Sequence, residues 1–213
     1  MERRNFVRNI GAGALFLGLG GVSYAFDRDK NKDKIKKYKK HITILHTNDT
    51  HSHIDPMPSD DPHYPDKGGV ARRAVLVEQV RRENPNTLLF DAGDIFQGTP
   101  YFNYYGGELE FRLMSMLKYD AATFGNHDFD NGIEGLLFQM PHAKFDFISS
   151  NYDFTNTVLE GKTKPYKVFE VDEVRIGVYG LGVELKGLVT KELYKETKYL
   201  DPVEIALDME KRL

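Results

Sequence analysis

Three short motifs in the chain combine carboxylate, imidazole and amide side chains that can bind a divalent cation. The first motif contains Asp49 and His51, the second contains Asp94, and the third contains Asn126. Thiolate ligands are excluded because the chain contains no cysteine. Oxygen and nitrogen ligands of this kind suit Zn, Mn or Fe(II). The motifs therefore predict a metal site, provided that folding brings them together.

Each motif directly follows a segment with the composition of a β-strand. Residues 41–47, 87–90 and 121–124 are short runs rich in apolar or β-branched residues. Between these runs, residues 70–82 and 109–117 have apolar side chains at helical spacing. Alternating strands and helices predict an α/β fold with parallel strands, whose carboxyl ends meet at one edge of a sheet. We therefore expect the three motifs to lie close together.

Asp94 is the candidate for a bridging ligand, because one carboxylate can bind two cations roughly 3.5 to 4 Å apart. Cations at that spacing stabilise both the attacking and the leaving oxygen of a phosphoryl displacement. Gly93 precedes Asp94, and Gly125 precedes Asn126. Both glycines permit close backbone approach where a strand turns into a loop. The pattern thus favours phosphoryl transfer to water.

The motifs resemble those of the calcineurin-like metallophosphoesterases, in the branch of bacterial 5′-nucleotidases, UDP-sugar hydrolases and 2′,3′-cyclic phosphodiesterases. Four blocks carry this resemblance, at residues 44–52, 68–73, 91–100 and 125–130. A single block of this length arises by chance, whereas four blocks in order are specific. The resemblance covers nearly the whole chain from His41 onward. It implies a layered α/β sandwich in which helices flank mixed β-sheets.

The resemblance also implies a metal-binding role for four residues. Asp49 and His51 would bind the first of two divalent cations (Zn, Mn or Fe), Asp94 would bridge the pair, and Asn126 would bind the second. His46 and His53 flank the first motif, and either could give a supporting hydrogen bond to one of these ligands, with His53 the better candidate.

His127 and Asp130 are the catalytic residues that the resemblance implies. His127 would lie beside the scissile phosphate, where it stabilises the transition state or protonates the leaving group, and Asp130 would orient its ring. A metal-bound hydroxide would attack, since coordination lowers the pKa of water to roughly 7. The implied substrates are nucleotide-type phosphate esters or anhydrides. A separate carboxyl-terminal domain or partner chain would hold the nucleobase, and nucleic acid is not an expected partner.

Further histidines, including a Gly-His-x-His segment, complete the two metal sites in this family. The last histidine of this chain is His142, and each cation takes about four to six ligands. We therefore expect residues 41–213 to be the amino-terminal part of a metallophosphoesterase domain, truncated at the carboxyl end. Two alternatives stay open. The chain is an inactive fragment that binds at most one cation weakly, or it is a relative of the thiosulfohydrolases.

The amino terminus has the pattern of an export signal. Residues 1–25 combine a charged start, an apolar glycine-rich run and small residues before a cleavage site after Ala25. Arg3 and Arg4 resemble a twin-arginine signal. The pattern predicts a periplasmic or extracellular protein that meets the membrane only during export. A buried amphipathic helix and an uncleaved membrane anchor are the alternatives.

A lysine-rich linker is predicted at residues 26–40. Residues 1–40 hold 11 basic and four acidic side chains, whereas the rest of the chain holds 18 and 28. The basic excess therefore belongs to the terminus. Lysines without interleaved aromatic residues are typical of a solvated tether, and contact with a membrane or nucleic acid is the alternative.

Strands and a helix are also predicted beyond the third motif. Residues 145–150, 163–171 and 174–181 have strand composition, and we expect these strands to extend the sheet. Residues 201–213 have a helical pattern with Pro202 in the first turn. The motifs therefore occupy the first half of an α/β arrangement that continues to the last residue.

Overall fold

The computed structural model describes residues 39–213. These residues form one compact unit. The predicted signal peptide at residues 1–25 lies outside the described residues, as does the predicted linker except for Lys39 and Lys40. Both remain predictions from the sequence.

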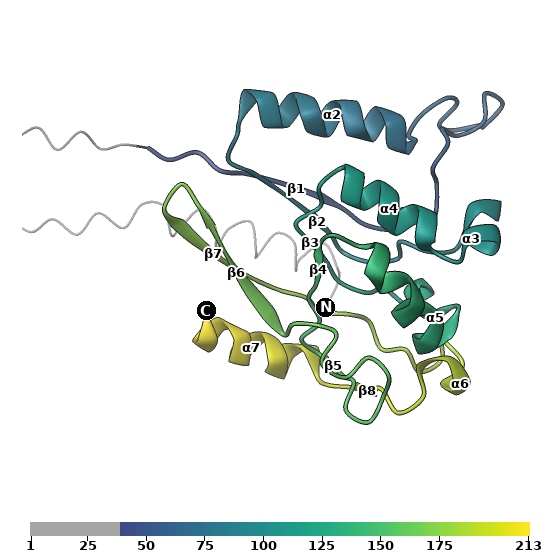
Figure 1. The fold of residues 1–213 in the computed structure, drawn as a ribbon, viewed down its shortest axis with the longest axis vertical. Coiled ribbons are helices and arrows are strands. Elements are labelled where there is room, and N and C mark those ends of the chain that lie inside the picture. The colour runs from purple at the N-terminus through teal and green to yellow at the C-terminus, as the bar shows by residue number, and fades with distance from the viewer. Residues whose placement is uncertain (1–38) are drawn as a thin grey trace, which may run out of the picture. The chain divides into compact units, whose positions relative to one another are not determined.

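The central sheet has four parallel strands in the order β1, β2, β3, β4 (Figure 1). Their bounds are β1 (Thr43–Thr47), β2 (Thr87–Asp91), β3 (Ala121–Ala122) and β4 (Asp146–Phe147). The last residues of these strands align, since Thr47 pairs with Asp91, Asp91 with Ala122, and Ala122 with Phe147. The predicted parallel arrangement is confirmed, and all four carboxyl ends lie at one edge of the sheet.

Helices connect the strands and cover one face of the sheet (Figure 1). They are α2 (Val70–Glu83), α3 (Pro100–Tyr105), α4 (Glu108–Met116) and α5 (Gly132–Gln139). The bounds of α2 and α4 agree with the predicted helices to within one residue. Together with the parallel sheet, these helices confirm the predicted α/β fold.

Short elements lie within the third motif and in the connections that follow it. They are the 3-10 turns η1 (His127–Phe129) and η2 (Met140–His142), the one-turn helix α6 (Lys191–Tyr194), and the antiparallel pair β5 (Tyr152–Asp153) and β8 (Lys198–Tyr199). His127 thus belongs to a tight turn that follows β3.

The hairpin of β6 (Tyr166–Val171) and β7 (Val174–Tyr179) forms its own antiparallel sheet. The expectation that these two strands extend the parallel sheet is therefore wrong, apart from an isolated parallel bridge between Lys164, which precedes β6, and Ile148. The strand predicted at residues 145–150 does extend the sheet, as β4. The apolar side chains of the hairpin pack on the face of the sheet instead of pairing along its edge, and the rings of Phe169 and Phe90 lie 5.4 Å apart. The hairpin thereby covers part of the face opposite the helices (Figure 1).

The last helix, α7 (Pro202–Arg212), agrees with the helix predicted at residues 201–213. The Asp201 side chain caps it by accepting hydrogen bonds from the backbone N–H groups of Val203 and Glu204 at 2.8 and 3.0 Å. α7 packs against β7, where a Cβ at Gly177 would lie 2.9 Å from the Leu213 Cβ. Only glycine, which has no Cβ, leaves room for this close contact.

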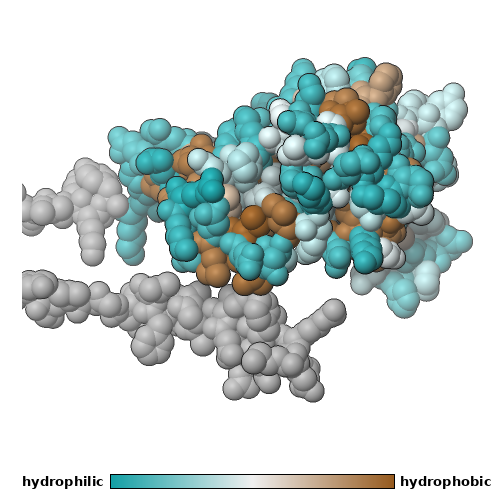
Figure 2. Space-filling view, turned by 90° about the horizontal axis from the view of Figure 1, so that it is seen from below, coloured by the Kyte–Doolittle hydropathy of each residue, from teal (hydrophilic) through white to brown (hydrophobic). Residues whose placement is uncertain are grey.

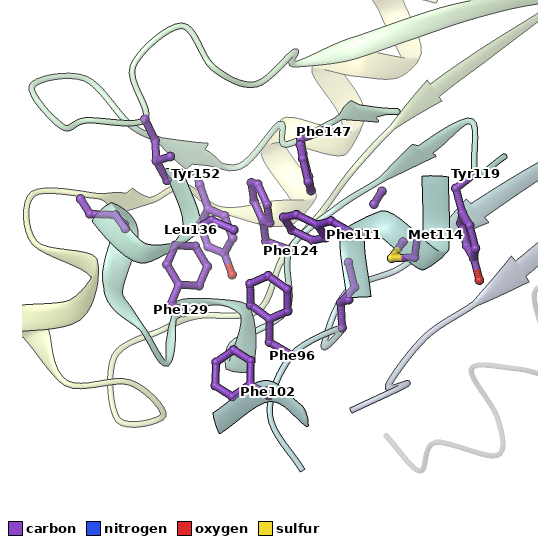
Figure 3. Close-up of a cluster of buried hydrophobic side chains, with 14 of the residues drawn as sticks. Phe96, Phe102, Phe111, Met114, Tyr119, Phe124, Phe129, Leu136, Phe147 and Tyr152 are labelled. Carbon is purple, nitrogen blue, oxygen red and sulfur yellow. The ribbon is translucent and has the colours of Figure 1, made fainter. Parts of the chain in front are cut away.

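Two apolar clusters lie on opposite faces of the parallel sheet. β2 contributes Leu89 to the larger cluster under the helices and Leu88 to the smaller cluster under the hairpin. This alternation explains the continuous apolar run of β2, because both of its faces are buried. In the larger cluster the rings of Phe96, Phe111 and Phe124 are at most 1% exposed (Figure 3). Phe96 and Phe124 lie next to predicted metal motifs, so the core anchors those loops.

The surface is mainly hydrophilic on the face shown in Figure 2, with apolar residues in a few small groups. Helix α7 exposes Val203, Leu207 and Leu213 to solvent. Within residues 39–213, none of the helices combines the length and the apolar character that crossing a bilayer requires.

Asp91, the last residue of β2, is a buried carboxylate with 4% of its surface exposed. It accepts hydrogen bonds from the Thr47 hydroxyl at 2.6 Å and from the Gly93 N–H at 2.9 Å. Thr47 Oγ1 also lies 2.7 Å from Tyr119 Oη. Burial raises the pKa of Asp91 to about 6, although both hydrogen bonds act to lower it.

The titration of Asp91 predicts a pH-dependent stability. Because the native pKa exceeds the ordinary value of 3.8, the folded chain binds this proton more tightly than the unfolded chain does. The protonated Asp91 side chain therefore stabilises the folded state fully below about pH 4, and this stabilisation is lost as the pH rises to about 6. Asparagine does not titrate. We therefore expect the free energy of unfolding of Asp91→Asn, relative to that of wild type, to increase by about 3 kcal/mol from about pH 4 to pH 7. Urea unfolding at both pH values measures this gain, and a parallel pH dependence of the two proteins would contradict it.

Candidate metal centre

The loops that follow β1 and β2 continue the hydrogen bonding of the sheet beyond its strands. The backbone N–H groups of Asp49, His51 and Ser52 donate to three successive carbonyl oxygens of the β2 loop, at 3.0, 3.0 and 2.9 Å. The first two predicted motifs are thereby joined along their whole length. Their relative position follows from the strand register and not from side-chain contacts alone.

Three predicted metal ligands meet at this edge of the sheet. One ligand atom each from Asp49, His51 and Asp94 lies within 4.8 Å of the other two. His51 Nε2 is 3.9 Å from Asp49 Oδ1 and 3.9 Å from Asp94 Oδ2. The side chains of Asp94 and His51 are 15% and 28% exposed, and Asp49 is 59% exposed. The group therefore has a protein side and an open side from which a substrate can approach.

The three ligand residues have backbone conformations that are rare outside glycine. The φ angles of Asp49, His51 and Asp94 are 49°, 44° and 54°. Positive φ values cost conformational energy and persist only where the surrounding structure enforces them. Here the shared backbone hydrogen bonds of the two loops provide that enforcement. Strain at three adjacent ligands is typical of a functional site.

The third motif contacts the second through its backbone. The His127 N–H donates to Asp94 Oδ1 at 2.9 Å, and a Cβ at Gly125 would lie 2.1 Å from the same oxygen. Asn126 lies between these two contacts and is half-buried. Asp49 and His51 thus lie close to Asp94, and so does the backbone on both sides of Asn126, whereas the bridging role of Asp94 and the ligand role of Asn126 stay predictions.

His127 and Asp130 form a hydrogen-bonded pair beside the ligands. His127 Nδ1 lies 2.9 Å from Asp130 Oδ2, and the His127 ring centroid is 5.1 Å from that of His51. The hydrogen bond to Asp130 raises the pKa of His127, and burial opposes this effect. Within residues 39–213, Nε2 has no hydrogen-bond partner, and the raised pKa favours a protonated ring.

The donor set fits a divalent cation. Two atoms bound to one zinc ion at about 2.0 to 2.2 Å are at most about 4.4 Å apart, and both of the measured separations from His51 Nε2 are shorter than that. Two carboxylates near each other repel when ionised, and a cation between them removes this repulsion. One histidine nitrogen with carboxylate and amide oxygens is a set that zinc, manganese and iron all accept.

Two buried carboxylates that support the loops, Asp128 and Glu110, were not among the predicted site residues. Asp128 is 1% exposed. Burial raises its pKa to about 7, whereas its hydrogen bonds to backbone N–H groups favour ionisation. Glu110 of α4 is 5% exposed and accepts a hydrogen bond from Ser52, the residue after His51. The sequence could have indicated that Glu110 is buried, because this residue lies among the apolar residues on the inner face of a helix.

His53 is exposed and its backbone N–H donates to the Thr50 carbonyl. Within residues 39–213, the structure gives no hydrogen bond from the His53 ring. Its predicted hydrogen bond to a metal ligand therefore stays a prediction. Gly98 has a clearer structural function, because a Cβ there would lie 2.7 Å from the His51 carbonyl oxygen. The loop after Asp94 therefore packs directly against the first motif.

Gly125→Ala is expected to weaken metal binding. The new Cβ would overlap Asp94 Oδ1 and the Asp94 backbone nitrogen, so the second and third loops must separate. We expect the affinity for Mn²⁺ in calorimetric titrations to fall about tenfold or more, as when a group that orients a metal ligand is lost. Gly161→Ala is the matched control, because that glycine has a φ of 71° and no atom within 4 Å of an added Cβ. The control should lose stability but keep its Mn²⁺ affinity, and equal affinities of all three proteins would refute the prediction.

Known proteins resemble this chain in sequence and in fold. A family model described as calcineurin-like phosphoesterase matches residues 42–208. The human 5′-nucleotidase is 42% identical over 147 residues, which are 65% of this chain and 26% of the human protein. The trifunctional nucleotide phosphoesterase YfkN of Bacillus subtilis (strain 168) is 32% identical over 199 residues, 78% of this chain and 13% of that protein.

A solved structure shows the same relation. The 5′-nucleotidase precursor from Thermus thermophilus has a TM-score of 0.73 and 37% identity, over 81% of this chain and 34% of that chain. The chain thus spans about a quarter of the human relative and about a third of the Thermus protein. The family model, in contrast, matches well over half of the chain. By this match and by its fold, the chain belongs to the calcineurin-like phosphoesterase family.

Proposed function

We propose that this chain carries the catalytic residues of an exported phosphoesterase that uses two divalent cations to hydrolyse phosphate esters or anhydrides of nucleotides. The observation that carries the proposal is the meeting of Asp49, His51 and Asp94 within 4.8 Å, beside the paired His127 and Asp130. A cluster of ligands next to an oriented histidine is the arrangement that metal-assisted hydrolysis of a phosphate requires.

The four ligand side chains divide the work of holding the cations. Asp49 and His51 would hold the first, Asp94 would be shared between the two, and Asn126 would hold the second through its amide oxygen. When bound, such cations supply Lewis-acid activation of water and of the phosphate. The backbone N–H of His127 donates to Asp94 Oδ1. That contact limits the rotation of Asp94 and keeps its other oxygen directed toward His51.

His127 acts on the leaving group. Asp130 accepts the hydrogen bond from Nδ1 and thereby orients the ring and stabilises its protonated form, in which Nε2 also carries a proton. The protonated ring donates this proton to the oxygen that departs from phosphorus, so that the alcohol leaves neutral. His127 therefore serves as a general acid, and Asp130 serves as the residue that orients it.

Nucleotides are proposed as substrates because the relatives reported above are named 5′-nucleotidase and nucleotide phosphoesterase. Recognition of the base is proposed to come from a separate carboxyl-terminal domain or partner chain, since most of the length of those relatives lies outside the match. A thiosulfohydrolase-like activity is the second reading of the same metal ligands. No contact among the described residues favours it.

Leaving-group dependence tests the role of His127. We expect His127→Ala to lower kcat for AMP by about 10² to 10⁴-fold and to lower kcat for bis-p-nitrophenyl phosphate much less, because p-nitrophenolate leaves without a proton. Asp130→Asn should give the same pattern with a smaller loss. His63→Ala is the control, since His63 is an exposed histidine in the loop before α2. Equal losses on both substrates would remove His127 as the acid, and turnover no faster than a metal blank in wild type would support an inactive fragment.

Export is proposed from the sequence of residues 1–25. Replacing both Arg3 and Arg4 by lysine should retain the protein inside the cell, because the twin-arginine pathway recognises the arginine pair and not its charge alone. Fractionation of a bacterial host, followed by immunoblotting, measures the exported share. Arg8→Lys is the matched control and should be exported normally. Unchanged export of the double variant would exclude the twin-arginine route.

A further inference from the structure

Asp128 is a buried carboxylate that accepts four backbone hydrogen bonds. Its Oδ1 accepts from the N–H groups of Ile95 and Phe96, at 2.9 and 3.1 Å, and its Oδ2 accepts from those of Asp94 and Gly125, at 3.0 and 2.8 Å. The side chain is 1% exposed. Each oxygen therefore uses its two acceptor directions on main-chain donors, and no part of the group is available to solvent.

The four donors belong to two different loops of the candidate metal centre. Three of them follow one another in the loop after β2, which carries Asp94. The fourth, Gly125, is in the loop after β3 and immediately precedes Asn126. The carboxylate of Asp128 thus connects the segment that holds the candidate bridging ligand to the segment that holds a ligand of the second cation.

The surrounding core makes this connection rigid. Ile95, Phe96 and Phe129 are at most 1% exposed, and Phe129 directly follows Asp128 in η1. Figure 3 shows Phe96 and Phe129 inside the aromatic cluster. Apolar packing on both sides prevents water from replacing Asp128 as the acceptor of these N–H groups. The left-handed backbone of Asp94, with a φ of 54°, is held by the same hydrogen bonds.

We propose that Asp128 is a positioning residue that holds the Asp94 and Asn126 loops at their metal-binding separation before any cation is present. This inference rests on the proposed function only in taking Asp94 and Asn126 as metal ligands. It assigns to the protein, and not to the cations, the work of organising the second half of the site. Asp128 itself binds no cation and contacts no substrate, because both of its oxygens are occupied.

Amide hydrogen exchange in the wild-type chain tests the proposal without any substitution. After treatment with EDTA, the amides of Asp94, Ile95, Phe96 and Gly125 should exchange at least about a hundredfold more slowly than in an unfolded peptide, because their acceptor is in place. Adding Mn²⁺ should change these rates little. Exchange at nearly the unfolded rate in EDTA, with protection only after Mn²⁺ is added, would show that the cation organises the loops and would overturn the proposal.

Asp128→Asn tests which residue is responsible. Asparagine has the same shape, but its NH₂ group would face two N–H donors in place of an acceptor. We expect the variant to lose protection at two of the four amides or more and to bind Mn²⁺ about tenfold more weakly. The amides of β2, which bond within the sheet, should stay protected. Retention of both Mn²⁺ affinity and amide protection would refute the role of Asp128.

Asn151→Asp is the matched control for this substitution. Asn151 is also fully buried, and its side chain exchanges two hydrogen bonds with the Gly182 backbone, at 2.8 and 2.9 Å. The exchange of amide for carboxylate disrupts a buried backbone contact to a similar extent. This control should unfold at a lower temperature while its Mn²⁺ affinity stays unchanged. Equal losses of affinity in the two variants would mean that Asp128 acts through general stability, against the proposal.

The readouts separate this inference from the proposed function. Neither hydrogen exchange nor Mn²⁺ binding depends on turnover. A chain that binds Mn²⁺ through preformed loops but hydrolyses neither AMP nor bis-p-nitrophenyl phosphate would contradict the proposed function and support the role of Asp128. If Asp128→Asn does not fold, the exchange measured on the wild-type chain in EDTA decides the question.

Discussion

The in-register pairing of three parallel strands is the constraint on which the candidate site depends. Because Thr47, Asp91 and Ala122 stand side by side in the sheet, the loops that follow them begin at the same level. A shift of one residue would exchange the two faces of each strand. In β2 that shift would expose Leu89 to the hairpin side and remove Asp91 from its bond to Thr47. The burial of β2 on both faces therefore also protects the position of the ligands.

The ligand loops combine local strain with strong anchoring. Asp49, His51 and Asp94 have positive φ values, and each is followed or faced by a buried residue that holds the backbone in place. Ser52 is bound by Glu110 and by the Thr99 hydroxyl at 2.9 Å. The aromatic cluster holds the two other loops (Figure 3). Candidate ligands on such loops would lose little conformational freedom on binding a cation, because folding has already restricted them.

Carboxylates are concentrated around this edge of the sheet. Asp49 and Asp94 face the open side, whereas Asp91 and Asp128 lie beneath them in the core. Burial raises the pKa of both inner groups, and the outer ones add a repulsion that acts in the same direction. Backbone N–H groups offset part of this cost for Asp128. The arrangement thus provides negative charge for a cation, while every oxygen of the two inner carboxylates accepts at least one hydrogen bond.

Local patterns were sufficient for much of the fold and for selecting the candidate site residues. The alternation of apolar runs predicted the parallel sheet, helices α2 and α4 and helix α7 with its proline in the first turn, because each depends on residues within a few positions of one another. The motif residues Asp49, His51, Asp94 and Asn126 were recognisable by type and by their place after strands. The side of the sheet on which the hairpin packs was not, since strand composition is the same for a strand at an edge and for one on a face.

The sequence by itself determined which side chains the chain can offer to a metal and in what order the strands and helices follow. Only the tertiary structure decided which carboxylates face the open site and which support it. Asp128 lies 34 residues from Asp94, and Ser52 lies 58 residues from Glu110. An aspartate in a motif looks the same in sequence whether its oxygens meet solvent, a cation or four backbone N–H groups. Contacts across such distances arise only when the sheet has brought the loops together, because they are made between segments with no local relation.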